Sequence, residues 1–259
     1  MLTIAGLLQQ PSTARIASES VFLNSNARAQ KLTEPFKVTE RYQGNSGDRY
    51  FDVRSTRRAS WIQAVNAKFF LRYIDESDDV LDFGCGTGEI ISRIPCRSRF
   101  GVEVNEPSRR EAESRGVHVL HDLTEMESSS VDVVISHHAL EHVSEPAPTL
   151  RELVRVLRPG GRAIIVVPAE NPRRAATRTW HDEPEKHLFS WSPLTLGNLM
   201  EDCGFTVKHA FIREFGYSHF LNPVRRVPLV YPLARRILAL FLDRFHSVCI
   251  AGRPNESGR

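Results

Sequence analysis

Short apolar stretches alternate with helical patterns through the middle of the chain. Five of the stretches are typical of buried strands, at residues 79–83, 100–104, 117–120, 131–136 and 163–167. The segments between and after them favour crossover helices, at residues 89–94, 107–114, 149–157 and 194–203. Strands that alternate with helices pair in parallel through right-handed crossovers, and helices then cover both faces of the sheet. The pattern therefore predicts a doubly wound α/β domain.

Two more runs with strand character follow, at residues 205–212 and 246–252. Residues 222–245 separate them and contain prolines, arginine pairs and an apolar centre at 237–242. This segment interrupts what would otherwise be a hairpin. We therefore expect a helical insertion at about residues 215–245.

The part of the chain before the first strand divides in two. Ile62, Val65, Phe69 and Ile74 have nearly helical spacing and predict a helix that leads into the sheet. Residues 1–56 are rich in polar side chains and have no sustained apolar period, so a partly irregular N-terminal arm is expected there. The catalytic or binding domain would then cover residues 57–259.

Composition narrows the class of protein only a little. With 259 residues and 41% hydrophobic content, the chain can bury one sizeable core. A net charge of +3 does not predict a polyanionic partner. The four cysteines lack the spacing of a disulfide framework or a zinc site, and no apolar run is long enough for a membrane span or a signal core. These features favour a cytoplasmic protein.

A glycine-rich sequence, DFGCGTG at residues 82–88, stands directly after the first predicted strand and before a predicted helix. Glycines at such a junction let the backbone turn sharply and approach a ligand closely. The start of the following helix offers N–H groups to anionic or polar atoms. A strand–helix turn without a ligand is the structural alternative.

The spacing of these glycines separates two classes of cofactor. The dinucleotide fingerprint Gly-x-Gly-x-x-Gly requires a glycine where this chain has Glu89, and a carboxylate there would repel a pyrophosphate. Asp82, ahead of the first glycine, suits a cationic group instead. S-adenosylmethionine carries an ammonium and a sulfonium, so the turn is predicted to bind S-adenosylmethionine rather than NAD.

Acidic residues follow the next two predicted strands. Glu103 ends the second strand, where a carboxylate can accept hydrogen bonds from both hydroxyls of a ribose, although a solvated acid is the simpler alternative. Asp122 follows the third strand and could accept a hydrogen bond from the amino group of adenine. An aspartate that only closes a turn explains this second position equally well.

Residues 80–205, about half of the chain, resemble the class I S-adenosylmethionine-dependent methyltransferases. Besides the glycine turn, the resemblance rests on SHHALEHV at 136–143, LRPGGR at 157–162 and VVP at 166–168. Within the class, these segments are similar to the small-molecule O-methyltransferases of the ubiquinone-pathway type. The resemblance implies a Rossmann-like, mostly parallel sheet of seven strands with an antiparallel last strand. It also implies that residues 157–162 form the turn before the fifth strand.

The resemblance further implies how the cofactor is held. Asp82 would hold the amino end of S-adenosylmethionine, Glu103 the ribose, and Asp122 with Leu123 the adenine. The other residues expected to contact the cofactor, or its product S-adenosylhomocysteine, are Gly84, Cys85, Gly86, Gly88, Val104, Ser136 and His137. Ser136 and His137 would pass beneath the methionine moiety.

Methyl transfer to a hydroxyl needs a general base, and histidine suits this role because its ordinary pKa lies near neutrality. His138 follows the fourth predicted strand, close to where the methyl group should project, and His142 lies four residues further on. His181 and His187 lie in a loop after the fifth strand that resembles the active-site cover of the family. These four histidines are the candidate catalytic residues.

A metal site is the alternative use of the same segment. Some ubiquinone-pathway relatives have an acid, a second acid and a histidine as metal ligands at the spacing of His138, Glu141 and His142. On a helix these positions share one face, so three ligands are geometrically feasible. Ordinary hydrogen bonds explain such a cluster without an ion, and no bound metal is expected.

The expected acceptor is a small or carrier-linked metabolite that is methylated on oxygen. The arginine pairs 225–226 and 235–236 flank an apolar centre, which suits an acidic or lipid-linked acceptor or a peripheral membrane contact through residues 222–245. A packed helix with a solvated basic face explains them as well. Nucleic acid is not favoured, because residues 136–139 lack the Asn/Asp-Pro-Pro-aromatic arrangement of base methyltransferases. The sequence carries no sign of the oligomeric state.

The sequence is also compatible with two other functions. An NAD-dependent oxidoreductase would keep the fold and change the cofactor. A non-catalytic regulatory protein would bind S-adenosylmethionine without transferring its methyl group.

Overall fold

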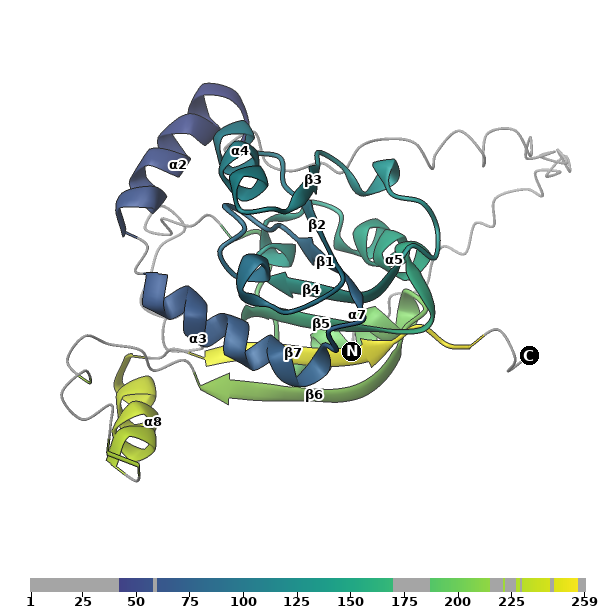
Figure 1. The fold of residues 1–259 in the computed structure, drawn as a ribbon. Helices are drawn as coiled ribbons and strands as arrows, with labels where there is room; N and C mark the ends of the chain where they lie inside the picture. Colours follow the sequence, from purple (N-terminus) through teal and green to yellow (C-terminus); the bar gives the residue numbers. More distant parts are fainter. Residues whose placement is uncertain are drawn as a thin grey trace, which may run out of the picture. The chain divides into compact units, whose positions relative to one another are not determined.

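A computed structural model of the chain describes residues 42–57, 60–169, 187–214, 221, 227–228, 230–242 and 245–255. All of them belong to one compact unit, residues 35–259. Its centre is a seven-stranded sheet with the order β3-β2-β1-β4-β5-β7-β6 (Figure 1). The strands are β1 (Asp79–Phe83), β2 (Ser98–Val102), β3 (His118–Leu120), β4 (Val131–His137), β5 (Leu157–Pro168), β6 (Thr206–Glu214) and β7 (Phe245–Gly252).

Pairing within the sheet confirms the predicted fold class. Strands β1 to β5 are parallel, with β1 between β2 and β4. Strand β7 runs antiparallel to both β5 and β6 and lies between them. Every residue of β1, including Asp79 and Asp82, is buried, which fits a strand with helices on both faces of the sheet.

Two hydrophobic clusters fill the two faces of the sheet. One contains apolar residues of α5 (Pro146–Val156) and α7 (Pro193–Asp202), such as Leu150 and Leu196. The other contains residues of α3 (Ser60–Phe70) and α4 (Glu106–Ser114), such as Phe70 and Ala112. The structure therefore confirms helices near all the positions predicted between residues 107 and 203, and the helix before β1.

The predicted crossover helix at residues 89–94 is wrong. The segment holds only a single 3-10 turn, η4 (Ile91–Arg93), and Ile94 is already extended with φ −99° and ψ 118°. Pro95 follows Ile94, and a residue before proline avoids the helical region. Too few residues separate the glycine turn from this proline for a regular helix to form.

Other boundaries also differ from the sequence expectations. Strand β5 begins at Leu157, so residues 157–162 belong to the strand rather than to a turn before it, and the β4–β5 register shifts between Val131 and Val133. Helix α2 (Gly44–Arg57) lies beside α4 and occupies the end of the segment expected to be a partly irregular arm (Figure 1). Residues 1–41 of that arm lie outside the described residues.

Helix α8 (Val230–Leu242) lies in the expected insertion between β6 and β7. The arginines at 225–226 lie outside the described residues. No helix in the described parts of the chain is both long and apolar enough to cross a membrane.

Candidate functional site

The glycine turn follows β1 at the carboxyl edge of the parallel strands. Gly84, Gly86 and Gly88 have φ angles of +74°, +54° and +71°, a conformation that side chains other than glycine seldom adopt. The turn is fixed to the neighbouring strand, because the N–H groups of Gly84 and Cys85 donate to the Val102 carbonyl at 2.9 and 3.1 Å. Three backbone positions of this loop therefore depend on glycine.

Gly84 also touches the segment that follows β4. A Cβ atom at Gly84 would lie 2.3 Å from the Cβ of Ala139, far inside van der Waals contact. The absent side chain lets the glycine turn meet the histidine-rich segment directly. The glycine turn and the candidate catalytic segment are thus neighbours.

Replacing Gly84 by alanine is expected to lower the free energy of unfolding by about 2–5 kcal/mol, because backbone strain and the collision with Ala139 add together. Gly116→Ala is the matched control, since Gly116 has φ +79° and a Cβ atom there would meet nothing within 4 Å. It should cost only the strain, about 1–2 kcal/mol. Urea unfolding followed by circular dichroism measures both. The double variant Gly84→Ala/Ala139→Gly should recover part of the loss; equal costs for the two single variants would contradict the steric argument.

Glu103 lies just past the end of β2 and braces the turn from the side. Its Oε2 accepts a hydrogen bond from the N–H of Gly86 at 2.9 Å, and its Oε1 accepts one from the N–H of Asn105 at 2.8 Å. A carboxylate oxygen can accept more than one hydrogen bond, so these contacts leave capacity for ribose hydroxyls. The position agrees with the ribose role predicted for Glu103, which stays a prediction.

Asp82 is the acidic residue of β1 nearest to the glycine turn and is 2% exposed. Burial, and secondly the negative charge of Glu103, raise the pKa of the Asp82 carboxyl to about 8. Asp82 therefore holds its proton at neutral pH when no cation is near. A neutral carboxyl of this kind can lose its proton and become negatively charged when an ammonium group lies beside it.

The predicted adenine residues have clear structural roles. Asp122 caps the 3-10 turn η5 (Leu123–Glu125) by accepting from the N–H of Thr124 at 2.8 Å, and Glu125 completes the capping box. The Leu123 side chain is fully buried in the core. Adenine recognition by these two residues stays a prediction, and it would involve groups beyond the capping oxygen and the leucine side chain.

Three other residues predicted to contact the cofactor lie around the same edge. The Ser136 side chain is buried and its hydroxyl donates to the Phe83 carbonyl at 3.0 Å, so it fixes the end of β4 to the end of β1. Val104 is half-buried beside Glu103. His137 stacks on His138, with ring centroids 4.5 Å apart, and its cofactor contact is untested.

A buried carboxylate lies at the centre of the candidate catalytic residues. The Glu141 side chain is 0% exposed, and its Oε1 lies 3.5 Å from Nδ1 of His138. The same oxygen lies 3.9 Å from Nε2 of His142 and 4.0 Å from Nε2 of His187. The backbone also joins these segments, because the N–H of Leu188 donates to the Glu141 carbonyl at 2.9 Å. Three of the four predicted catalytic histidines thus surround one acid, and His181 lies outside the described residues.

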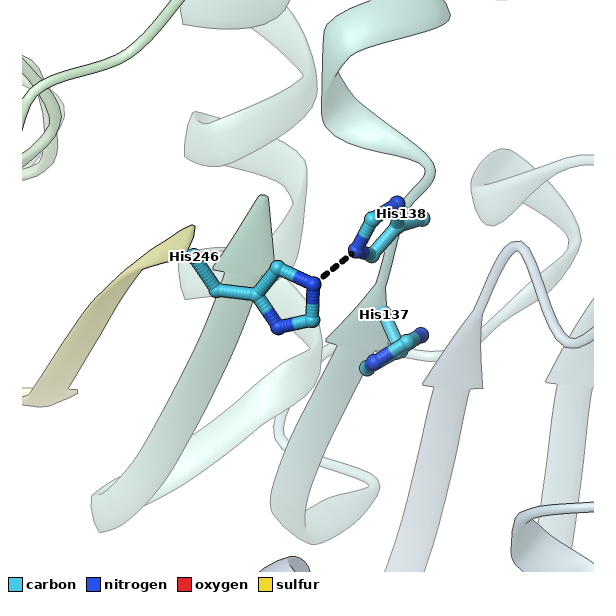
Figure 2. A group of neighbouring side chains, drawn as sticks. All are labelled: His137, His138 and His246. Atoms are coloured by element: carbon cyan, nitrogen blue, oxygen red, sulfur yellow. Dashed lines mark hydrogen bonds between the residues drawn. The ribbon is translucent and has the colours of Figure 1, made fainter. Parts of the chain in front are cut away.

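Sequence reasoning missed two residues of this region. Tyr42 comes from the segment expected to be an arm, and its hydroxyl lies 2.8 Å from Nδ1 of His142. His246, near the start of β7, lies with its Nε2 2.9 Å from Nε2 of His138 (Figure 2). No sequence signal points to Tyr42. His246 could have been found, because an antiparallel last strand starts at the edge where the parallel strands end.

The sheet order, the glycine turn after β1 and the acid after β2 together define a Rossmann-like methyltransferase domain. Comparison with known proteins agrees. The family described as "Methyltransferase domain" matches residues 53–210, more than half of the chain. The chain belongs to this family and carries an S-adenosylmethionine-dependent methyltransferase domain.

Two curated relatives are methyltransferases that act on oxygen. A tRNA (carboxymethyluridine(34)-5-O)-methyltransferase of Arabidopsis thaliana is 27% identical over 53% of this chain and 35% of its own length. A ubiquinone biosynthesis O-methyltransferase of Aeromonas salmonicida is 34% identical over 45% of this chain and 51% of its own length. The chain therefore matches about a third to a half of the length of these relatives.

Solved structures show the same fold. A methyltransferase in complex with the Haloferax volcanii Trm112 methyltransferase activator superposes with a TM-score of 0.61 at 18% identity, over 86% of this chain and 100% of its own. Together, these findings confirm the predicted fold and the methyltransferase family, and the family implies S-adenosylmethionine as the cofactor. They leave no support for the NAD-dependent alternative.

Proposed function

We propose that this enzyme transfers the methyl group of S-adenosylmethionine to an oxygen of a small or carrier-linked metabolite, with His187 as general base. The observation that carries the proposal is the buried Glu141 carboxylate, which faces His187 beside the segment that contacts the glycine turn. A carboxylate next to an imidazole stabilises the imidazolium that forms when the imidazole takes a proton.

The cofactor would lie over the glycine turn at the carboxyl ends of the strands, where ligands bind in open α/β sheets. The ribose hydroxyls would donate to Glu103, which the Gly86 and Asn105 N–H groups already hold in place. The ammonium of the methionine moiety would favour the ionised form of Asp82 and so lower its raised pKa. Cofactor binding would thus convert a neutral buried acid into a paired carboxylate.

The transfer itself is an in-line displacement. An oxygen lone pair of the acceptor forms a bond to the methyl carbon while the carbon–sulfur bond breaks. The electron pair of the broken bond stays on the sulfur of S-adenosylhomocysteine. The hydroxyl proton passes to the imidazole of His187. The protein contributes mainly by aligning the two reactants, removing this proton and excluding water.

Among the described histidines, His187 fits the role of base best. The ring of His138 has one nitrogen facing His246 and the other facing Glu141. The His142 side chain is only 10% exposed, and its Nδ1 is hydrogen bonded to Tyr42. The His187 side chain is 26% exposed, so a substrate can reach it more easily than it can reach His142, while its Nε2 faces Glu141.

Oxygen as the methylated atom is supported by the names of both curated relatives, which describe O-methyltransferases. A lipid-linked acceptor is supported by helix α8. Val230, Leu233 and Ile237 are 45%, 61% and 46% exposed, and their spacing places them on one side of the helix next to the exposed Arg236. An apolar stripe with a basic neighbour suits an acceptor carried on a membrane surface.

An acceptor screen tests the function. The protein is incubated with S-adenosylmethionine and a set of hydroxylated metabolites, free or in lipid vesicles, and mass spectrometry records a gain of one methylene in the acceptor together with S-adenosylhomocysteine. Methyl ethers or esters are expected. Products methylated only on nitrogen or carbon would contradict the oxygen assignment. Tight cofactor binding without any methylated product would favour the non-catalytic regulator.

A further inference from the structure

Three histidine rings gather at the carboxyl edge of the sheet. His137 ends β4, His138 follows it, and His246 lies near the start of β7 (Figure 2). Each of the three rings offers one nitrogen atom as a ligand, and these three nitrogens lie within 4.8 Å of one another. The rings of His137 and His138 stack at an interplanar angle of 28°, and the His246 ring meets both edge-on.

The backbone brings these residues together from positions far apart in the sequence. In the sheet, β5 separates β4 from β7, and it pairs Val166 with His137 and Pro168 with His246. The N–H of His138 donates to the Val166 carbonyl at 2.9 Å, which holds the residue after β4 against β5. His138 has φ +60°, a strained conformation for a residue with a side chain. Such strain persists where surrounding structure imposes it, and it is common at functional sites.

We propose that His137, His138 and His246 bind one divalent transition-metal ion of the zinc class. Imidazole nitrogens are preferred ligands of zinc, cobalt, nickel and copper ions, and three of them on one ion are the ligand set of a catalytic zinc site with an open fourth position. Water or an acceptor oxygen would occupy that position. The set differs from the His138, Glu141 and His142 combination that the sequence suggested, because two of its three ligands are new.

The surroundings of the cluster support metal binding. Oε1 of Glu141 lies 3.5 Å from Nδ1 of His138. A carboxylate behind a metal-bound histidine orients the ring and strengthens its donor nitrogen.

The charges around the cluster also allow a cation. Arg213 pairs with His246 in the β6–β7 register, and its guanidinium lies over the Phe69 ring, 4.0 Å from the ring centroid. This positive group opposes a second cation. Glu141 is fully buried on the other side of His138, and its negative charge offsets the effect.

Metal binding is measured without cofactor or acceptor, so this inference and the proposed function can fail independently. Untagged protein is treated with a chelator, and Zn²⁺ is then titrated in by calorimetry. Co²⁺ is titrated in parallel, because its visible absorption reports nitrogen ligands and coordination geometry. One ion per chain is expected, with a Kd of about 1 μM or tighter. No binding at about 100 μM Zn²⁺ would overturn the proposal.

Variants locate the ion. His246→Ala should weaken Zn²⁺ binding by at least about 100-fold, and Glu141→Gln by about tenfold, since Glu141 only orients a ligand. His209→Ala is the matched control, because His209 is an exposed histidine of β6. It should change the Kd by less than about twofold.

His246 is buried, so its variant could unfold. His138→Asn is the second variant, because asparagine tolerates a positive φ and His138 is 33% exposed at the side chain. Thermal unfolding by circular dichroism identifies the variants that fold. Zn²⁺ binding within about threefold of the wild-type Kd in a folded variant would overturn the assignment. If His187→Ala loses Zn²⁺ binding while His138→Asn keeps it, the ion would lie at Glu141, His142 and His187. That result would overturn the assignment as well.

Discussion

Replacement of His187 by alanine is expected to lower kcat by about 10²–10⁴-fold while the Kd for S-adenosylmethionine changes by less than about twofold. The alanine variant loses the imidazole that is proposed to take the proton of the acceptor hydroxyl. It keeps the glycine turn and Glu103, which hold the cofactor in the proposed complex. Steady-state kinetics with the acceptor found in the screen, together with calorimetry for the cofactor, separate the two effects.

The pH profile distinguishes a base from a residue that only packs. In the wild type, kcat/KM should fall at low pH as the imidazole of the free enzyme becomes protonated and can no longer take a proton. This acidic limb should be absent in His187→Ala, and added imidazole should restore part of the rate. His209→Ala provides a control on an exposed histidine of the same protein. A His187→Ala variant with nearly wild-type kcat would move the base to another histidine.

Replacement of Glu103 by alanine is expected to weaken S-adenosylmethionine binding by about 100-fold, equivalent to about 2.7 kcal/mol. The carboxylate accepts hydrogen bonds from the N–H groups of Gly86 and Asn105. In the proposed complex it also accepts hydrogen bonds from the ribose hydroxyls. Hydrogen bonds to a charged group contribute about 1.5–3 kcal/mol each, so the loss of the ribose contacts accounts for the effect. Calorimetric titration with S-adenosylmethionine measures it.

A neighbouring acid supplies the control for Glu103. Glu106 is exposed in the first turn of α4, where it pairs with Arg109 and Arg110. Glu106→Ala should leave the cofactor affinity within about twofold of the wild type, because exposed ion pairs contribute little. Glu103→Gln keeps one acceptor oxygen and should fall between the two variants. Equal affinities of Glu103→Ala and Glu106→Ala for the cofactor would refute the ribose role.

The sequence predicted best where a strand is buried on both faces. Residues 79–83 form a short, mainly apolar run around Val80 and Leu81 with glycines directly after it, and β1 has the predicted bounds. The predicted helix at 89–94 failed because apolar spacing over six residues does not reveal the turn imposed by Pro95. Helix α2 was missed because it is polar around most of its surface and depends on tertiary contact with α4.

The candidate site was predictable to the extent that it lies close to strand ends. Glu103 and the glycines come directly after strands, so their positions follow from the fold. Tyr42 and His246 reach the site only through tertiary structure, since they lie 100 and 108 residues away from the histidines that they contact. For Asp122, predicted to recognise adenine, the position was predictable but the role was not. Asp122 has both the predicted position and a capping bond that any aspartate could make there.

Strand β7 has a consequence for biosynthesis. It lies between β5 and β6, although both are made earlier, so β6 has no partner in the sheet until residues 245–252 have left the ribosome. During translation, the unpaired edges of β5 and β6 are open to pairing with other chains. His246, near the start of β7, comes into contact with His137 and His138 when β7 enters the sheet. The nascent chain therefore completes the sheet and its histidine cluster together, once β7 has been made.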